Sequence, residues 1–306
     1  MTVGARRHVV LAGSEGRLEV PPAIASAQGF SRRVVIDRAV SVHMNLAVCE
    51  LQPGGRVPWH VHSFEESIYV LEGEVVSESG DGDVLLREGD YGVYAVGAPH
   101  AWRNDGNAPA RWVQMLAPQQ RSGDGADTFA VEAPVRAHGQ VVAVDARDPR
   151  TRSFGHIDPG NMDVDRQKQE YLAMSASMRT ALLVYSGITV KMMVDTDLGA
   201  SQATMFMVQY EPGGFAGAHD HPFEEAFVIL AGEVDTVLDG VPYRLTPGDV
   251  AFAGVGCTHQ FTNPTDAPVR WLETQAPQPP ARHSYRFARD WDYLADRLTS
   301  RKDDGG

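Results

Sequence analysis

Short hydrophobic runs separated by turn signals dominate the chain. The runs at 67–76 and 226–238 are rich in Val, Ile, Phe and Tyr, and turn sequences follow them at 80–82 and 238–240. Such runs, with Gly and Pro between them and almost no helical periodicity, are typical of the strands of a sandwich or barrel. The pattern therefore predicts an all-β fold.

The chain contains the same domain twice. The segment PGGRVPWHVHSFEESIYVLEGEV begins at Pro53 and the segment PGGFAGAHDHPFEEAFVILAGEV begins at Pro212, an offset of 159 residues. This offset holds without a gap as far as Gln119. A repeat of this length is a whole domain and not a solenoid unit. We therefore expect two barrels, at 30–120 and 188–279.

The segments outside the two copies differ in composition. Residues 121–187 begin with a Gly- and Asp-rich stretch and include a turn sequence at 158–161, so we interpret them as a connector. In the tail, 280–306, apolar residues at i, i+4, i+7 and i+11 predict a short amphipathic helix packed on a barrel or on a second subunit. These positions are Phe287, Trp291, Leu294 and Leu298.

Composition and charge narrow the class of protein. The chain has 306 residues, of which 43% are hydrophobic and 22% charged, as in an ordinary soluble globular protein. Lys and Arg total 27 against 40 Asp and Glu, and the net charge of −13 argues against duplex nucleic acid or an anionic membrane surface as a partner. No apolar run approaches the ~18 residues of a membrane helix, and the start lacks the apolar region of a secretory signal. Because Cys49 and Cys257 cannot form a disulfide framework, we expect a cytoplasmic protein.

Histidine and glutamate recur at the same spacing in each copy. His60 and His62 stand at i and i+2, which on a strand places both side chains on one face. Glu66 follows four residues later, and His100 comes from a later strand. The second copy repeats the set with His219, His221, Glu225 and His259. Three imidazoles and a carboxylate suit a first-row divalent metal, with positions open for water or substrate. A lone strand histidine is usually structural, but a set repeated in register predicts two metals per chain, each Fe, Mn, Ni or Co.

Both copies resemble the cupin superfamily of jelly-roll barrels. The first cupin motif, a Gly, then His-x-His, Glu and a second Gly, is matched by Gly54, His60, His62, Glu66 and Gly73 and by Gly213, His219, His221, Glu225 and Gly232. The second motif is matched by Gly89, Gly97, His100 and Asn104 and by Gly248, Gly256, His259 and Asn263. In both copies the proline of the second motif is replaced, by Ala95 and Gly254. The resemblance implies a bicupin, with two tandem jelly-roll barrels that each hold a metal.

The resemblance to quercetinase-like bicupins implies a dioxygenase or related oxidoreductase that acts on an enol, phenol or flavonol-type substrate. Dioxygen is then a second substrate, and Glu66 or Glu225 takes a proton as general base. Trp102 and Phe261 stand two residues after the last histidine of each set, so strand alternation turns them toward the metal as pocket walls. The competing interpretation for both aromatic residues is barrel core.

Other classes of function fit the same ligands. Bicupins resembling oxalate decarboxylase act on a small carboxylate, which requires a buried cation. Strand alternation places Arg56 on the face of His60 and His62, and the second copy has no equivalent. An aminohydrolase like the ureidoglycine-processing bicupins ranks lower because its ligand spacing differs, and a non-catalytic ligand-binding cupin is the remaining class. In every case we expect a small-molecule ligand, no nucleic acid, and a homo-oligomer that covers exposed sheet edges.

Overall fold

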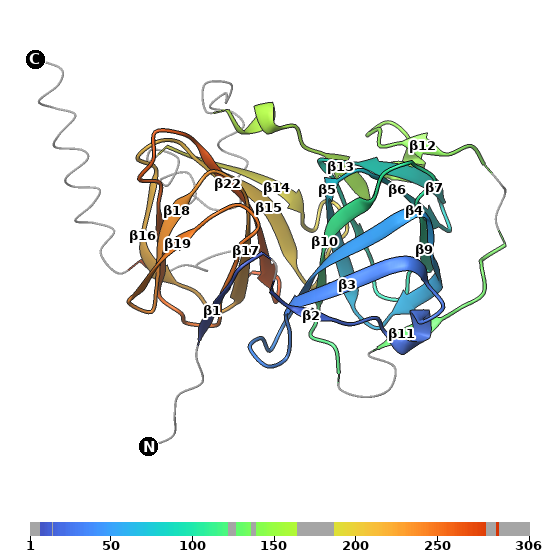
Figure 1. The fold of residues 1–306 in the computed structure, drawn as a ribbon, viewed down its shortest axis with the longest axis horizontal. Coiled ribbons are helices and arrows are strands. Elements are labelled where there is room, and N and C mark those ends of the chain that lie inside the picture. Colours follow the sequence, from blue (N-terminus) through green and yellow to red (C-terminus); the bar gives the residue numbers. More distant parts are fainter. Residues whose placement is uncertain are drawn as a thin grey trace, which may run out of the picture.

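The computed structural model describes residues 7–13, 15–121, 127–135, 139–163, 187–279 and 286–287. Within these ranges the regular structure consists of strands and three short 3-10 helices, η1 (Pro22–Ile24), η2 (Pro149–Thr151) and η3 (Pro159–Met162). The strands form two lobes side by side (Figure 1). This architecture confirms the prediction of an all-β protein with two jelly-roll barrels. In the described part of the chain, no helix is long and apolar enough to span a membrane.

The first barrel is one continuous curled sheet. Its strands are β2 (Arg17–Leu18), β3 (Gln28–Ile36), β4 (Asn45–His62), β5 (Glu65–Glu72), β6 (Glu74–Ser79), β7 (Gly82–Arg87), β8 (Asp90–Tyr94), β9 (His100–Arg103), β10 (Ala110–Ala117), β11 (Thr128–Ala130), β12 (Val142–Ala143) and β13 (Phe154–His156). They run in the order β12-β7-β6-β9-β4-β10-β5-β8-β13, and β3 and β11 also pair with β4. Because β4 is 18 residues long, its first part pairs with β10 and its last part with β9.

The second barrel consists of two sheets, and one of its strands comes from the far end of the sequence. Its strands are β14 (Ile188–Val194), β15 (Thr204–Tyr210), β16 (Phe215–Asp220), β17 (Glu224–Ala231), β18 (Val234–Leu238), β19 (Val241–Leu245), β20 (Val250–Ala253), β21 (His259–Thr262), β22 (Val269–Ala276) and β23 (Arg286–Phe287). The sheets have the orders β1-β20-β17-β22-β15-β14 and β19-β18-β21-β16-β23. Strand β1 (His8–Leu11) pairs with β20, so the N-terminal segment completes the second barrel (Figure 1).

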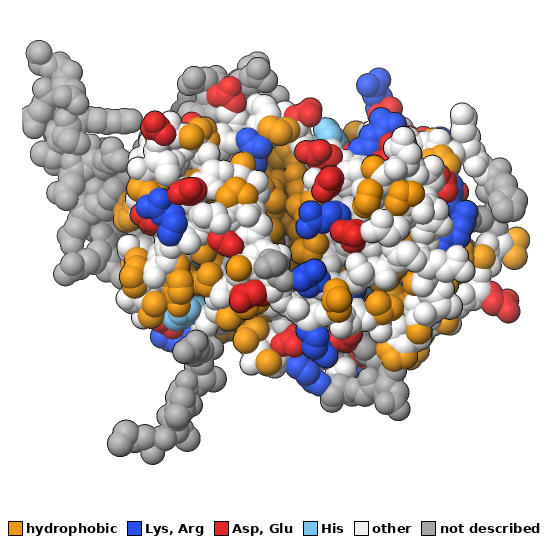
Figure 2. Space-filling model, viewed as in Figure 1, with side chains coloured by type: hydrophobic (Ala, Val, Ile, Leu, Met, Phe, Trp, Pro, Cys, Tyr) orange, Lys and Arg blue, Asp and Glu red, His pale blue; other side chains and the backbone are white. Residues whose placement is uncertain are grey.

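The two barrels share one hydrophobic core at their junction. Buried residues of both copies form a single cluster there, among them Met44, Met115, Met193, Met205 and Met207. The flexible methionine side chain fills irregular gaps between curved sheets. Apolar side chains run along the junction of the lobes in Figure 2, between charged groups on either side.

Two buried glutamates join the barrels reciprocally. Glu224 of the second barrel accepts hydrogen bonds from Ser41 Oγ at 2.6 Å and from the backbone N–H groups of Val42 and His43 at 2.8 and 2.9 Å. Glu65, 159 residues earlier, accepts one from the backbone N–H of Ser201 at 2.7 Å. Each barrel therefore anchors a loop of the other through a charge-assisted hydrogen bond.

Parts of the predicted organisation lie outside the described residues. Trp291, Leu294 and Leu298 of the predicted tail helix are among these, whereas Phe287 belongs to the short strand β23. The domain boundaries drawn from the repeat stay predictions.

Candidate metal centres

Three strands of the first barrel bring His60, His62, Glu66 and His100 together. His60 and His62 end β4, Glu66 is the second residue of β5, and β9 begins at the last histidine. In the antiparallel pairing of β4 with β9, His60 lies opposite His100. One potential ligand atom from each of the four residues lies within 4.8 Å of the others. The structure therefore assembles the whole predicted set in this barrel.

Backbone carbonyl groups orient two of these imidazoles. His60 Nδ1 lies 2.7 Å from the carbonyl oxygen of Pro58, and His100 Nδ1 lies 3.0 Å from that of Ala98. Because a carbonyl oxygen only accepts, Nδ1 carries the proton in both rings and Nε2 keeps its lone pair. This is the tautomer that binds a metal through Nε2.

The atoms that face the centre of this set lack hydrogen-bond partners. Nε2 of His62, Nε2 of His100 and Oε2 of Glu66 are all buried, and none makes a hydrogen bond. The two nitrogens lie 2.9 and 3.4 Å from Glu66 Oε2. Buried polar atoms without a partner are rare and destabilising, and a cation at their common point would satisfy all three. Imidazole nitrogens with one carboxylate suit Mn, Fe, Co or Ni, so the residues fit the predicted metal.

A buried chain of hydrogen bonds holds Glu66 in place. Its side chain is 0% exposed, and Oε1 accepts a hydrogen bond of 2.8 Å from Gln114 Nε2. The oxygen of the Gln114 amide accepts from Arg32 Nε at 2.6 Å, and since arginine only donates, this contact fixes which end of the amide faces Glu66. Burial alone would raise the pKa of Glu66, but the facing imidazoles of His100 and His62 hold it well below its usual range. Glu66 is therefore an ionised carboxylate that Gln114 holds through Oε1, while Oε2 faces the imidazoles without a hydrogen bond.

Acidification is expected to destabilise the metal-free protein. Burial holds the pKa of His60 well below its ordinary value and lowers the pKa of His219 to about 3. Such a group binds more protons in the unfolded chain, so the free energy of unfolding falls as the pH drops from about 6.5 toward 3, by about 1.4 kcal/mol per unit of pKa difference. Urea denaturation of EDTA-treated protein at about pH 7.5 and about pH 5 measures the effect. An equal midpoint at both pH values would contradict the burial of neutral imidazoles.

The second barrel brings together three of its four predicted ligands. Potential ligand atoms of His221, Glu225 and His259 lie within 4.8 Å of one another. Nε2 of each histidine lies 2.7 or 3.2 Å from Glu225 Oε2, and Gln275 Nε2 donates to Oε1 at 2.5 Å. His219 is not part of this set, although its ring centroid is 4.3 Å from that of His259. A ligand role for His219 stays a prediction.

An additional buried carboxyl group distinguishes the second centre. Glu273 stands 159 residues after Gln114, at the matching position of β22, and accepts a hydrogen bond of 3.0 Å from Trp271 Nε1. Burial and the neighbouring Glu225 carboxylate raise the pKa of Glu273 well above its usual range. The two centres therefore differ in their surroundings although their motifs match.

A third group of potential ligand atoms has other partners. His8, Asp239 and Cys257 also lie within 4.8 Å of one another. However, Arg7 binds the Asp239 carboxylate through Nε at 3.0 Å and Nη2 at 2.8 Å. Burial also raises the pKa of the Cys257 thiol to about 12, which disfavours the thiolate that binds metals. We therefore do not interpret this group as a metal centre.

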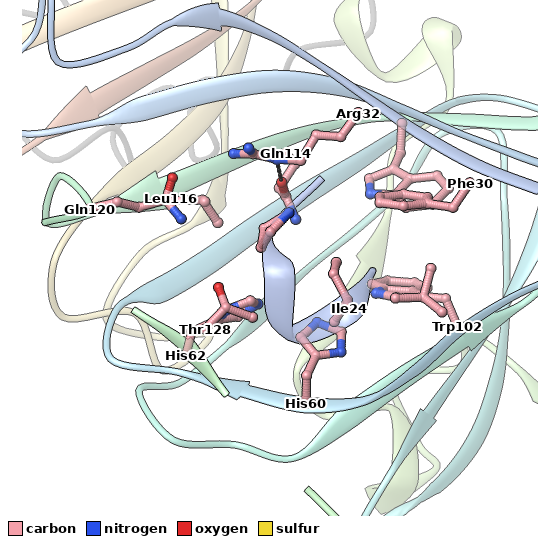
Figure 3. A pocket seen from close by; sticks show the side chains of 13 residues that line it. Ile24, Phe30, Arg32, His60, His62, Trp102, Gln114, Leu116, Gln120 and Thr128 are labelled. Carbon is pink, nitrogen blue, oxygen red and sulfur yellow. Dashed lines mark hydrogen bonds between the residues drawn. The ribbon is translucent and has the colours of Figure 1, made fainter. Parts of the chain in front are cut away.

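A pocket opens beside the first centre. His60 and His62 lie on one side of it and Arg32 on the other (Figure 3). Trp102, predicted as a pocket wall, is a lining residue and stacks on Trp112 with ring centroids 5.3 Å apart. The pocket thus joins the His and Glu set to a buried cation and an aromatic wall.

The other two predicted pocket residues lie elsewhere. Arg56 is exposed and does not line this pocket. Simple alternation fails because β4 has a bulge relative to β9 between Val57 and His60, which shifts the inward face by one residue. Phe261 is 2% exposed and packs on Phe227, with ring centroids 4.7 Å apart, in the core of the second barrel.

Sequence reasoning missed Arg32, Gln114 and Thr128, which also line the pocket. Thr128 lies opposite His62 in the β11–β4 pairing, with Oγ1 3.0 Å from His62 Nδ1. All three lie outside the two motifs, on β3, β10 and β11. Their direction depends on strand pairing, and only the alternation of Trp112 with Gln114 along β10 offered a local signal.

The structure thus shows two curled β-barrels, each with a set of His and Glu side chains. Comparison with known protein families matches the same domain to both barrels. The cupin domain model matches residues 47–116 and 206–274. The chain therefore belongs to the cupin superfamily and is a bicupin.

Solved structures share this double-barrel fold. Oxalate decarboxylase from Lactobacillus farciminis, in a formate complex, aligns with a TM-score of 0.62 at 15% identity over 95% of this chain and 93% of that chain. Oxalate decarboxylase from Bacillus subtilis, studied for its Mn(II) centres, aligns with a TM-score of 0.61 at 16% identity over 95% of this chain and 83% of that chain. A putative glyoxylate-induced protein from Pseudomonas aeruginosa gives 0.62 at 16% identity over 93% and 92%. At such identities the likeness establishes the fold alone.

One curated relative is similar in sequence over a shorter region. Dimethylsulfoniopropionate lyase from Ruegeria pomeroyi is 40% identical over 83 residues, which are 24% of this chain and 41% of the relative. The chain thus spans less than half the length of this relative. The comparisons therefore establish the double cupin fold and a local sequence similarity to one lyase.

Proposed function

We propose that the protein is a metal-dependent lyase whose reaction takes place at the centre of the first barrel. The observation that carries this proposal is the convergence of His60, His62, Glu66 and His100 beside a pocket, with Gln114 holding Glu66 through Oε1. A metal held by this set would supply a Lewis acid for a substrate oxygen. The activities named for the similar proteins, a decarboxylase and a lyase, support cleavage without net oxidation.

The hydrogen bonds that hold Glu66 favour a lyase over the oxygenase that the sequence analysis favoured. An oxygenase of the quercetinase type requires the glutamate to move and take the substrate proton. Here Gln114 holds Glu66 Oε1, and Arg32 in turn holds Gln114, so this movement breaks a buried network. Breaking buried hydrogen bonds to a charged group costs about 1.5–3 kcal/mol each. In this proposal Glu66 remains a ligand throughout the reaction.

A dioxygenase is the second candidate, and the aromatic wall of the pocket favours it. Trp102 stacks on Trp112, which stacks on Phe30 with ring centroids 6.0 Å apart, and all three line the pocket. Such a wall suits a flat enol or phenol. In this candidate dioxygen is the second substrate, and Glu66 is the general base.

Metal content and oxygen uptake distinguish the candidates. Purified chain is loaded with Mn, Fe, Co or Ni and offered oxalate, dimethylsulfoniopropionate, flavonols, catechols and β-diketones. The lyase predicts product release from a member of the first pair with no net oxygen uptake. Oxygen uptake that matches the turnover of a flavonol, catechol or β-diketone would refute the lyase and support the dioxygenase.

The second centre has a supporting role in this proposal. His221, Glu225 and His259 would hold a metal that stabilises the barrel, with Glu225 as a ligand and not as a base. Assembly into a homo-oligomer and a cytoplasmic location belong to the same proposal.

A further inference from the structure

A buried arginine faces the pocket with an unused donor. Arg32, on β3, is 2% exposed, and its Nε and Nη2 groups donate to Gln114 Oε1 at 2.6 Å and Asn45 Oδ1 at 2.5 Å. Its Nη1 group is buried and has no hydrogen-bond partner. Within the described ranges no carboxylate forms an ion pair with this guanidinium. Its hydrogen bonds go only to neutral amides, and the charges of Glu19 and Glu66 act on it without direct contact. An anion that accepts from Nη1 would complete the surroundings of this buried cation.

A second unused donor lines the same pocket. Trp112 is 1% exposed, and its indole Nε1 is also buried without a hydrogen-bond partner. An indole nitrogen, like a guanidinium, only donates. The residues that line the pocket therefore include two with buried N–H donors that lack an acceptor, together with the predicted metal ligands His60 and His62. Arg32 and the two histidines lie on opposite sides of the pocket in Figure 3.

In the second barrel, the equivalent indole N–H has a carboxyl group of the protein as its acceptor. Trp271 is the counterpart of Trp112, and its Nε1 donates to the carboxyl group of Glu273 at 3.0 Å. Glu273 stands at the position of Gln114. In the first barrel the carboxylate is absent and Arg32 is present, whereas Val190 has the register position of Arg32 in the second. The internal repeat thus shows which group the indole N–H binds when one is supplied.

We propose that Arg32, with the indole N–H of Trp112, binds the carboxylate of a small organic acid substrate in the first barrel. This inference rests on the proposed function of that barrel and names its substrate class. The substrate carboxylate accepts from Arg32 Nη1 and Trp112 Nε1, which places the remainder of the molecule toward His60 and His62. A divalent cation with Arg32 outweighs the single charge of Glu66, so the loaded site is positive and attracts an anion. The second barrel, with Val190 and Glu273, is not a carboxylate site.

Equilibrium binding tests this assignment independently of turnover. Metal-loaded chain is titrated with acetate and oxalate by calorimetry at constant ionic strength, and acetamide serves as the uncharged probe. We expect Arg32→Gln to weaken carboxylate binding by about tenfold or more, and Trp112→Phe by about threefold or more. Acetamide should bind no better to wild type than to Arg32→Gln.

Two matched substitutions control for charge and for loss of an indole. Arg56→Gln removes an exposed arginine of the same barrel, and Trp271→Phe removes the counterpart indole; both should keep carboxylate affinity within about twofold of wild type. Equal affinity in Arg32→Gln and wild type, or an equal loss in Trp271→Phe and Trp112→Phe, would overturn the proposal. If Arg32→Gln does not fold, Trp112→Phe decides, because it keeps the ring and removes one donor.

The same titration separates this inference from the proposed lyase. If carboxylate binding depends on Arg32 but the chain turns over none of the offered substrates, the proposed binding site is supported and the proposed lyase activity is refuted. If the chain turns over a substrate and Arg32→Gln does not change its KM, the proposed binding site is refuted and the proposed lyase activity is supported.

Discussion

Replacing His60 and His62 together by alanine is expected to empty the first centre and abolish turnover. Two of four converging ligand groups are lost, and the remaining Glu66 and His100 do not form a closed set. Lewis-acid catalysis supplies several kcal/mol of transition-state stabilisation, so kcat should fall by about 10³-fold or more. Elemental analysis of the purified variant should show the loss of one metal per chain.

The matched variant in the other barrel is the control. His219→Ala with His221→Ala should release metal from the second centre and leave kcat within about threefold of wild type. Unchanged metal content in both double variants would refute the ligand assignment. Loss of turnover in the second-barrel variant alone would move the reaction to that barrel.

Replacing Glu224 by alanine is expected to be the most destabilising single change at the junction of the barrels. Glu224 is 2% exposed and accepts three hydrogen bonds from residues 41–43 of the other barrel. Its removal leaves the buried Ser41 hydroxyl and two partly buried backbone N–H groups without their acceptor, and opens a small cavity. Hydrogen bonds to a charged group contribute about 1.5–3 kcal/mol each but are not additive, so we expect a loss of about 3 kcal/mol.

Urea denaturation followed by tryptophan fluorescence measures this loss. Glu233→Ala removes an exposed glutamate of the same barrel, with 51% of its side chain accessible, and should leave the midpoint almost unchanged. Because one hydrophobic cluster spans the junction, both barrels are expected to lose stability together. A midpoint for Glu224→Ala equal to that of Glu233→Ala would show that the reciprocal contacts do not hold the barrels together.

The potential metal ligands are predictable because their geometry is mostly local. Residues at i and i+2 share a face on any strand, so His60 and His62 need no tertiary information to point the same way. The repeat supplied a second copy of the pattern, and the agreement of the two copies argued against coincidence. His219 shows the limit, since a matching motif position does not ensure a place within the set.

The pocket was harder to predict because it depends on strand register. Alternation assigned the buried cation to Arg56, but a bulge in β4 turns that residue outward, and Arg32 on a neighbouring strand faces the pocket instead. A bulge of one residue reverses every inward and outward assignment beyond it. The sequence around Arg32 does not show which of the adjacent residues Arg32 and Arg33 faces the pocket.

The sequence by itself determined that this protein is all-β, contains one domain twice and carries two sets of potential metal ligands, because strand periodicity, turn residues and a gapless repeat are local features of the chain. The resemblance of its motifs to a known family then implied cupin barrels. Only the tertiary structure decided that Arg32 and Trp112 face the first centre, that β1 completes the second barrel, and that buried glutamates join the two. These features arise where strands distant in sequence are paired and bulged, and their side chains acquire partners only when the sheets close.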